Sequence, residues 1–229
     1  MRNKSRDSDA DIGLGGEKLS AYLYKIKGEQ RSRLLSLLQT LYPTIVDFRI
    51  VQERAGWKHI LVIEEYGEKR VESEAKHIND GLLRVLAVLS QVTGDRPVLL
   101  FDEIENGVNP EVVGGLVKVL QESQCQLIVT SHSPLILNYL TDDFAERAVQ
   151  FVYRSFDGST KARPFFSIAR TSQKLEYMGP GEAFVDTSLP ELAAEANALD
   201  IEQSKKENTL REELKKRIGA RRSAERGAE

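Results

Sequence analysis

The sequence is poor in the residues that cross-link a chain or anchor it in a membrane. Cys125 is the single cysteine among 229 residues, so no internal disulfide can form and a reducing compartment is favoured. Cys125 starts an apolar run, which favours packing in or near the core over nucleophilic chemistry. No apolar run reaches the roughly 18 residues that span a bilayer, and the amino terminus lacks the apolar core of a signal peptide. These absences predict a cytoplasmic protein without a membrane segment.

An excess of charge of one sign is also lacking. The formal net charge is -3, with 41% hydrophobic residues, enough for the core of one or two domains. This balance gives no global reason to expect nucleic acid as a partner, so any basic surface must be local. One candidate is residues 204–229, where nine Lys and Arg stand against five Glu. We expect this tail to be a solvated helix or disordered; the alternative is an arm that binds a partner or nucleic acid.

The phosphate loop of nucleotide-binding proteins, Gly-x-x-x-x-Gly-Lys-Ser/Thr after a strand, is missing as well. The nearest segment is residues 13–20, but Glu17 separates Gly16 from Lys18 and no strand is predicted before it. We expect this segment to lead flexibly into a helix. The polar residues 1–12 before it predict a disordered lead.

Apolar periodicity predicts the order of the elements around these segments. It indicates two helices before Pro43, then a β-hairpin that turns at Ala55-Gly56, and later a helix that begins at Asn79 or Asp80 as N-cap. The predicted helices lie near 19–26, 34–41, 81–90 and 134–140, and the predicted strands lie near 45–51, 59–64, 70–72, 148–153 and 164–168.

The stretch from Pro97 to Pro134 carries the strongest pattern. An apolar run, 98–101, ends in Asp102-Glu103, a proline-led helix follows, and a second apolar run, 126–129, ends in Thr130-Ser131-His132. Two strands joined by a helix describe a crossover unit of a parallel sheet, whose chemistry lies at the carboxyl ends of the strands.

Adjacent carboxylates at a strand end form the Walker B arrangement. Asp102 would act on a hydrated Mg²⁺ through water, and Glu103 would orient or deprotonate the water that attacks a γ-phosphate. His132, one helix and one strand later, could donate a hydrogen bond to that phosphate or to that water. The simpler alternative is that these are ordinary polar residues at strand ends.

Three segments in this order resemble a known family. They are His-Ile-Asn-Asp-Gly-Leu-Leu-Arg at 77–84, Leu-Leu-Phe-Asp-Glu-Ile-Glu-Asn-Gly at 99–107, and Ile-Val-Thr-Ser-His-Ser-Pro at 128–134. Together they resemble the carboxyl-terminal half of ABC-type ATPases of the RecF, SMC and OLD-like group, closest to small bacterial AAA-family ATPases of the AAA15/AAA21 type. The resemblance implies an α/β fold: a parallel-sheet P-loop NTPase lobe, ABC ATPase-like, with helical and antiparallel β additions. It also implies ATP and Mg²⁺ as cofactors.

By this resemblance Asn79, Asp80 and Gly81 form the signature segment, which in such families binds the γ-phosphate of ATP held on a second protomer. Amide groups at a helix N-terminus provide the physical reason. The family usually has Ser where Asn79 stands, and often His where Asn109 stands. Arg84, one turn into the helix, supports the nucleotide site or simply covers the helix surface.

The resemblance also implies that something is absent from the chain, since such an ATPase needs a Walker A loop and a glutamine loop. We therefore expect an incomplete lobe, inactive alone, completed by a Walker A-containing partner or a missing N-terminal half in an ATP-sandwiched homo- or heterodimer. A complex in DNA repair or phage defence, with an effector, toxin or nucleic acid as a further partner, is implied by analogy.

The expected organisation has three parts. Residues 1–12 are the lead, 13–170 the ATPase-like portion, and 171–229 a C-terminal extension with a charged tail. The middle portion divides into a helical and hairpin part, 13–75, a signature-to-histidine part, 76–140, and following strands, 147–170.

Two other classes of function remain open. The chain could be a non-catalytic regulatory interaction module derived from such an ATPase. A metal-dependent nuclease of the Toprim kind is the third reading, but the chain after Tyr139 is short, and Asp142-Asp143 and Asp157-Gly158 form no recognisable paired-carboxylate site.

Overall fold

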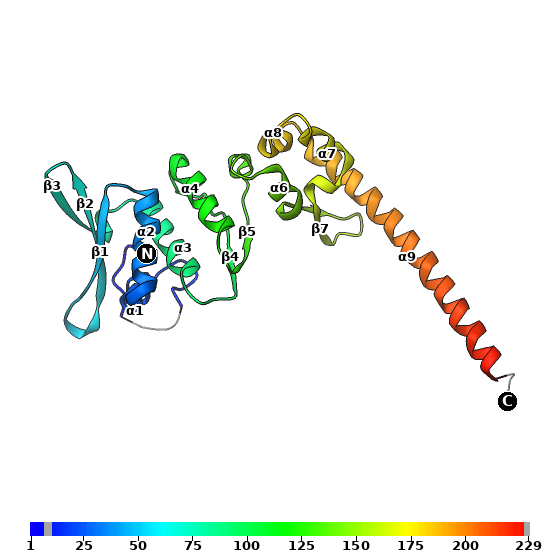
Figure 1. Ribbon diagram of the computed structural model, residues 1–229, viewed down its shortest axis with the longest axis horizontal. Helices are drawn as coiled ribbons and strands as arrows, with labels where there is room; N and C mark the ends of the chain where they lie inside the picture. Colours follow the sequence, from blue (N-terminus) through cyan, green and yellow to red (C-terminus); the bar gives the residue numbers. More distant parts are fainter. Residues whose placement is uncertain (7–10, 227–229) are drawn as a thin grey trace. The chain divides into compact units, whose positions relative to one another are not determined.

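The computed structural model describes residues 1–6 and 11–226 (Figure 1). The chain divides into two compact units, unit 1 over residues 1–139 and unit 2 over residues 140–229. This division differs from the sequence-based one, which assigned 147–170 to the ATPase-like portion. The strands in that range pair only with each other and bury aromatic side chains in a core of their own, which places them in unit 2.

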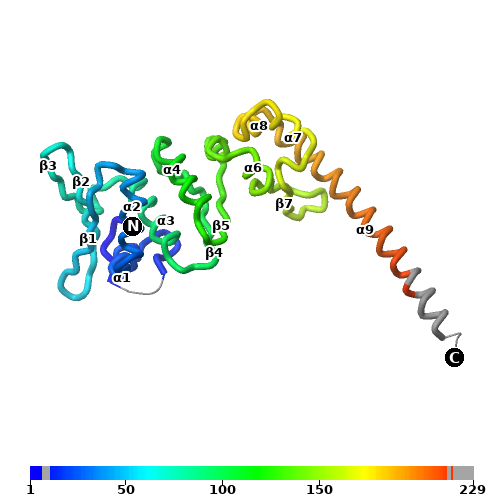
Figure 2. The backbone as a smooth tube through the Cα atoms, in the orientation of Figure 1, coloured from blue at the N-terminus to red at the C-terminus, as the bar shows by residue number. Residues whose placement is uncertain are grey.

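Unit 1 opens with two helices and an antiparallel sheet. Helix α1 (Leu19–Lys25) and helix α2 (Gly28–Leu41) pack against strands β1 (Ile45–Gln52) and β2 (Lys58–Tyr66), and β3 (Lys69–Glu74) pairs with β2. The connection between β1 and β2 contains a short 3₁₀ turn, Arg54–Gly56, and a second one, Ala75–His77, follows β3. The predicted helix pair, hairpin and third strand are therefore all present, as Figure 2 traces.

The first six residues also belong to unit 1. The Ser5 backbone exchanges hydrogen bonds with the Lys58 backbone at 3.0 and 3.1 Å, and the buried Ser5 hydroxyl lies 2.7 Å from the Ser20 hydroxyl. The expectation of a disordered lead is thus wrong for residues 1–6, because Ser5 is tied to β2 and α1. Residues 7–10 lie outside the described part of the chain.

Helix α3 (Asp80–Val92) is the most deeply packed element of unit 1. The Asn79 side chain accepts a hydrogen bond from the Leu82 amide at 2.7 Å, so Asn79 is the N-cap. Every residue from 81 to 92 is buried except Arg84. A helix apolar on almost all sides must be surrounded by other elements, and α2 is one of its neighbours.

The predicted crossover unit is present. Strand β4 (Val98–Phe101), helix α4 (Pro110–Gln121) and strand β5 (Gln126–Val129) follow in order, and β4 and β5 pair in parallel, with Leu100 opposite Ile128. Asn109 caps α4 through the Glu111 amide, and Pro110 occupies the first turn. Short helix α5 (Pro134–Leu137) follows, and Cys125 is half-buried just before β5.

One face of this two-stranded sheet is uncovered within unit 1. Leu99 is buried, whereas Leu100 is 71% exposed and its cross-strand neighbour Ile128 is 50% exposed. Parallel sheets are normally covered on both faces. The pattern therefore leaves an apolar face on β4 and β5 that the described residues of unit 1 do not fill.

Unit 2 consists of short elements around an aromatic core. Helix α6 (Asp142–Ala148) leads to the antiparallel pair β6 (Gln150–Arg154) and β7 (Thr160–Pro164), followed by a 3₁₀ turn (Phe165–Ser167), α7 (Ala169–Leu175), α8 (Pro180–Val185) and α9 (Leu189–Arg226). The buried core residues are Ala145, Tyr153, Phe165, Phe166, Ile168, Leu175, Ala183, Leu192 and Ala196.

The predicted strand at 164–168 is misplaced. The hairpin turn at Asp157-Gly158 is tight and pairs Arg154 with Thr160, so β7 begins directly after the turn and ends at Pro164. The two phenylalanines that follow turn inward in the 3₁₀ segment instead of continuing the strand.

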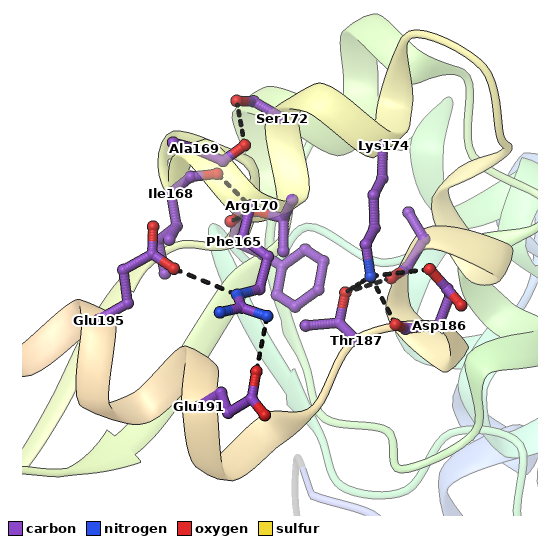
Figure 3. A network of polar contacts seen from close by, with 12 residues as sticks. Phe165, Ile168, Ala169, Arg170, Ser172, Lys174, Asp186, Thr187, Glu191 and Glu195 are labelled. Carbon is purple, nitrogen blue, oxygen red and sulfur yellow. Dashed lines mark hydrogen bonds and ion pairs between the residues drawn. The ribbon is translucent and has the colours of Figure 1, made fainter.

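A polar network joins the helices of unit 2 (Figure 3). Arg170 of α7 makes ion pairs with Glu191 at 2.6 Å and Glu195 at 3.3 Å, both in the first turns of α9. Lys174 lies 2.9 Å from the Asp186 carboxylate and donates to the Thr187 hydroxyl at 3.0 Å. These contacts hold α7 against the start of α9 and the loop after α8.

The tail is helical as far as residue 226. Figure 1 draws α9 as one long helix, and its stripe of Leu210, Leu214 and Ile218 is exposed. Among the described residues, no helix is both long and apolar enough to cross a bilayer.

Candidate functional site

The polar residues that end β4 and β5 lie together, as the sequence predicts for a crossover unit. The His132 Nε2 atom lies 2.9 Å from Glu103 Oε1, and the Asn106 side chain donates to Glu103 Oε2 at 3.2 Å. Both oxygens of the Glu103 carboxylate therefore have partners. The His132 side chain is 75% exposed and that of Glu103 37%, so both can be reached from solvent.

Thr130 joins the two strand ends. Its hydroxyl donates a short hydrogen bond to Asp102 Oδ1 and accepts one from the Glu103 amide at 2.9 Å. The Thr130 amide in turn donates to the Phe101 carbonyl at 2.9 Å, which continues the parallel ladder. One side chain directly after β5 thus contacts both carboxylate residues that follow β4.

Glu105 holds the segment that carries His132. Its Oε1 atom accepts from the Ser131 hydroxyl at 2.8 Å and from the His132 amide at 3.3 Å. The Oε2 atom is buried and has no hydrogen-bond partner among the described residues. Glu105 therefore fixes the backbone of His132, whose imidazole reaches the neighbouring Glu103.

The signature residues predicted from the resemblance lie at the start of α3. The Asn79 side chain is occupied by the Leu82 amide, and the exposed Asp80 carboxylate pairs with Arg2 at 2.7 Å. Gly81 packs against the loop after β4: a Cβ at this position would lie 2.3 Å from the Gly107 carbonyl oxygen. The start of α3 is therefore in direct contact with the loop that follows Asp102 and Glu103.

Arg84 reaches the same loop from one turn further along α3. Its Nη2 group donates to the Asp102 carbonyl and to the Glu103 carbonyl, each at 3.0 Å. The Arg84 side chain therefore contacts the backbone of both residues that carry the carboxylates.

Glu103 has an unusual backbone. Its φ is 48°, and it and Ala55 are the non-glycine residues with positive φ in the described part of the chain. This region is rarely adopted by residues with a Cβ and costs of order 1 kcal/mol or more. Such strain persists where the surroundings hold it, and it is frequent at functional sites.

The glycine-rich segment before α1 does not resemble a phosphate cradle. The Gly13 amide donates to Asp11 Oδ1 at 3.2 Å, and the Gly15 amide donates to Glu17 Oε2 at 3.0 Å. These amides are taken by carboxylates of the chain itself.

The fit of the site to a metal ion depends on its carboxylates. Among the described residues no group of three or more His, Cys, Asp or Glu side chains is placed to hold a metal. Mg²⁺ is usually held by one or two carboxylates together with water and substrate phosphates. The exposed Asp102 carboxylate fits an Mg²⁺ ion that arrives with a nucleotide and does not fit a cage made by the protein alone.

A family model agrees with this reading of unit 1. The model described as "AAA domain, putative AbiEii toxin, Type IV TA system" matches residues 5–138, more than half of the chain. The chain belongs to this AAA domain family. The match lies within unit 1 and includes Asp102, Glu103 and His132, so the resemblance to AAA-type ATPases inferred from the three motifs is confirmed.

Solved structures similar to this AAA protein include heads of SMC ATPases. One, from work on ATP-driven dimerization and DNA-stimulated activation of SMC ATPases, has a TM-score of 0.46 and 18% identity, over 64% of this chain and 89% of that one. Another is the Smc head domain of Pyrococcus furiosus, with an extended coiled coil and bound to the C-terminal domain of ScpA. It has a TM-score of 0.46 and 16% identity, over 70% of this chain and 40% of that one.

A third is an Smc head bound to the C-winged helix domain of ScpA, with a TM-score of 0.45 and 18% identity, over 66% of this chain and 46% of that one. This AAA protein thus spans less than half of the last two chains. Likenesses of this degree establish no function for it. No curated protein matches the sequence.

Sequence reasoning missed three contributors to the site of this AAA domain. Thr130, Glu105 and Asn106 stand within the motifs, but no role at the site was predicted for them. Each acts on a residue 3 to 28 positions away through a side-chain hydrogen bond. The signal available in the sequence was their position directly after a strand, where polar side chains gather.

Proposed function

We propose that unit 1 is the hydrolysing and sensing half of an ATPase site, which carries the signature segment, Walker B and a switch histidine. The observation that carries this proposal is the pair of Glu103 and His132, 2.9 Å apart across the ends of two parallel strands and beside the exposed Asp102. Membership of the AAA domain family supports an ATPase module in general terms.

In this proposal each side chain has a distinct task. Bound ATP with Mg²⁺ supplies the γ-phosphoryl group that water attacks. Glu103 accepts the proton of that water, and Asp102 faces the hydrated ion. His132 donates its Nε2 hydrogen to Glu103 in the present arrangement, so it can respond to a change at the carboxylate. Asn79, Asp80 and Gly81 face the nucleotide of a second protomer.

The site is completed by a Walker A segment from another chain or from an N-terminal half. The apolar face at Leu100 and Ile128 supports this, because a parallel sheet of two strands with one bare face is a marginal structure. A strand that pairs with the exposed edge of β5 would extend the sheet and bring a phosphate loop to the same end, and residues attached to that strand would cover the bare face. The isolated chain is then inactive, and the working form is an ATP-sandwiched homo- or heterodimer.

The cellular setting follows by analogy. We place the protein in the cytoplasm, in a complex of the DNA-repair or phage-defence type, where its ATP cycle controls an effector, a toxin or nucleic acid. The description of the family as a putative AbiEii toxin of a type IV toxin–antitoxin system supports a role in defence.

Phosphate release tests this proposal. The chain is mixed with a polypeptide that carries a Gly-x-x-x-x-Gly-Lys-Ser/Thr segment, encoded in the neighbouring or continuing reading frame, and release is measured with and without Mg²⁺. We expect release only from the mixture with Mg²⁺. Glu103→Gln should lower kcat by about 100-fold or more, the usual contribution of a general base, and leave ATP binding in place.

Glu146→Gln is the matched control, because Glu146 is an exposed glutamate of α6 in unit 2. Equal release from the wild-type and Glu103→Gln mixtures would contradict the role of Glu103. If Asp102→Ala and His132→Ala also leave complex formation and the cellular effect unchanged, the chain is instead the non-catalytic interaction module.

A further inference from the structure

Arg84 is the exception in a buried helix. All other residues from 81 to 92 of α3 are buried, and Arg84 is partly buried. Arginine on such a helix costs less when its charge and its donors have partners. Here the guanidinium has two, and both are backbone carbonyls of the β4 end.

The carbonyls that Arg84 contacts flank the strained residue. One belongs to Asp102 and the other to Glu103, whose φ is 48°. In this backbone conformation the Asp102 and Glu103 carbonyls both face the same donor group at 3.0 Å. A cation shared between successive carbonyls stabilises that orientation relative to an extended one, in which neighbouring carbonyls point to opposite sides.

A second contact couples α3 to the same loop. Gly81 lies so close to the Gly107 carbonyl that even a methyl group would not fit, so the first turn of α3 is in direct contact with the loop after β4. The backbone of Arg84, one turn further along α3, is therefore held close to this loop. Two other side chains contact Glu103: the Thr130 hydroxyl accepts from its amide, and the Asn106 side chain donates to its carboxylate.

We propose that Arg84 is a positioning residue that holds Glu103 in its left-handed backbone conformation and so aims the Glu103 carboxylate at His132. It acts through the carbonyls of Asp102 and Glu103, and it does not bind nucleotide. The proposal rests on the proposed function for its effect on hydrolysis, but its structural content does not.

The first test uses the full chain alone and requires no hydrolysis. Isotope-labelled wild-type protein should show a strong nuclear Overhauser effect between the Glu103 amide and its own Hα, the signature of a positive φ. Arg84→Met, which keeps an unbranched stem and removes the charge and the donors, should lose this signature and shift the His132 imidazole resonances. Arg84→Lys should restore both in part, because its ammonium group keeps the charge and can donate to the same carbonyls but lacks the length and the rigid plane of the guanidinium.

Arg33→Met is the matched control, because Arg33 is an exposed arginine of the neighbouring helix α2, and it should leave both signals unchanged. Unchanged Glu103 and His132 signals in Arg84→Met would overturn the proposal. If Arg84→Met does not fold, Arg84→Lys decides: a weakened Glu103 signature with shifted His132 resonances supports the proposal, and fully wild-type signals overturn it.

The second test uses the completed ATPase. Arg84→Lys should lower kcat at least 10-fold while KM for ATP changes less than 2-fold. A raised KM with unchanged kcat would instead make Arg84 a nucleotide-binding residue and overturn the proposal. If the completed protein hydrolyses no ATP at all, the proposed function fails while the result from the isolated chain stands.

Discussion

At the scale of single residues, three neighbours stabilise the charged form of the Asp200 carboxylate. Its carboxylate accepts from the Tyr153 hydroxyl at 2.7 Å and pairs with Arg163 at 2.7 Å and Lys161 at 3.0 Å. Burial by itself raises the pKa of Asp200, but the hydrogen bonds from Arg163, Tyr153 and Lys161 outweigh it and hold the pKa at about 2. The charged form of Asp200 therefore ties β6 and β7 to α9 in unit 2.

Asp200→Asn should make unit 2 less stable at neutral pH. A carboxyl group whose pKa is lower when folded stabilises the protein above its unfolded pKa, and this contribution disappears as the pH falls through the folded pKa. We expect a loss of about 2 kcal/mol in the free energy of unfolding at pH 7, and a difference from wild type that shrinks between about pH 4 and pH 2. Urea unfolding followed by circular dichroism at several pH values measures it.

Glu176→Gln provides the comparison for Asp200, since Glu176 is exposed at the end of α7. It should change stability by less than about 0.5 kcal/mol at any pH. If the difference in free energy of unfolding between wild type and Asp200→Asn does not change with pH, the contacts with the three partners do not require a charged carboxylate.

At the scale of elements, the contact between α3 and the loop after β4 decides how the site is assembled. Asn79 caps the helix locally, whereas Gly81 is constrained by a neighbour 26 residues away. Helix propensity alone would favour alanine over Gly81 by up to about 1 kcal/mol. The close approach of the Gly107 carbonyl opposes this gain, because the methyl group of alanine would clash with it.

Gly81→Ala should therefore destabilise unit 1 despite the gain in propensity. An added methyl group that must displace backbone costs about 1–3 kcal/mol, so we expect a net loss. Trp57, the sole tryptophan, lies in unit 1, and its fluorescence during denaturant unfolding reports the effect. Gly15→Ala is the control, because its added Cβ would meet only the end of the Glu17 side chain, at 3.4 Å. A more stable Gly81→Ala variant would show that the loop yields.

At the scale of the whole molecule, the chain is two units of different character. Unit 1 holds the family match, the proposed half-site and a bare apolar sheet face. Unit 2 holds an aromatic core and the long helix α9. The bare apolar face indicates where a completing segment would bind unit 1.

Leu100→Glu should leave the isolated chain folded and prevent its completion. Leu100 is already 71% exposed, so a charge there costs little until a partner covers it. We expect its affinity for the Walker A polypeptide to fall by about 100-fold or more in calorimetric titration, since an unpaired charge would be buried. Val152→Glu, at a 62% exposed strand position of unit 2, should bind as wild type does. Equal affinity of Leu100→Glu and wild type would place the partner elsewhere.

Local pattern was enough to predict much of unit 1. The helix pair, the hairpin, the Asn79 cap and the order strand, carboxylates, helix, strand, histidine all follow from residues within a few positions of one another. Such features depend on propensity, capping and periodicity, which are properties of short stretches.

The strand predicted at 164–168 failed for the opposite reason. The β7 strand pairs with β6 from Thr160 to Pro164, so the ladder ends where the predicted strand would begin. The apolar residues that follow are buried in the core of unit 2 instead. The sequence also did not predict that 147–170 belongs to the second unit, because this depends on which core each strand joins.

By itself, the sequence determined the family, the fold class of unit 1 and the identity of the polar residues at the strand ends, because each is encoded in a contiguous motif. Only the tertiary structure decided that Thr130 bridges Asp102 and Glu103, that Arg84 contacts their carbonyls, and that Glu103 takes a left-handed backbone. The contacts of Arg84 and Thr130 join residues 18 to 28 positions apart. Their geometry exists only when α3, β4 and β5 have packed together.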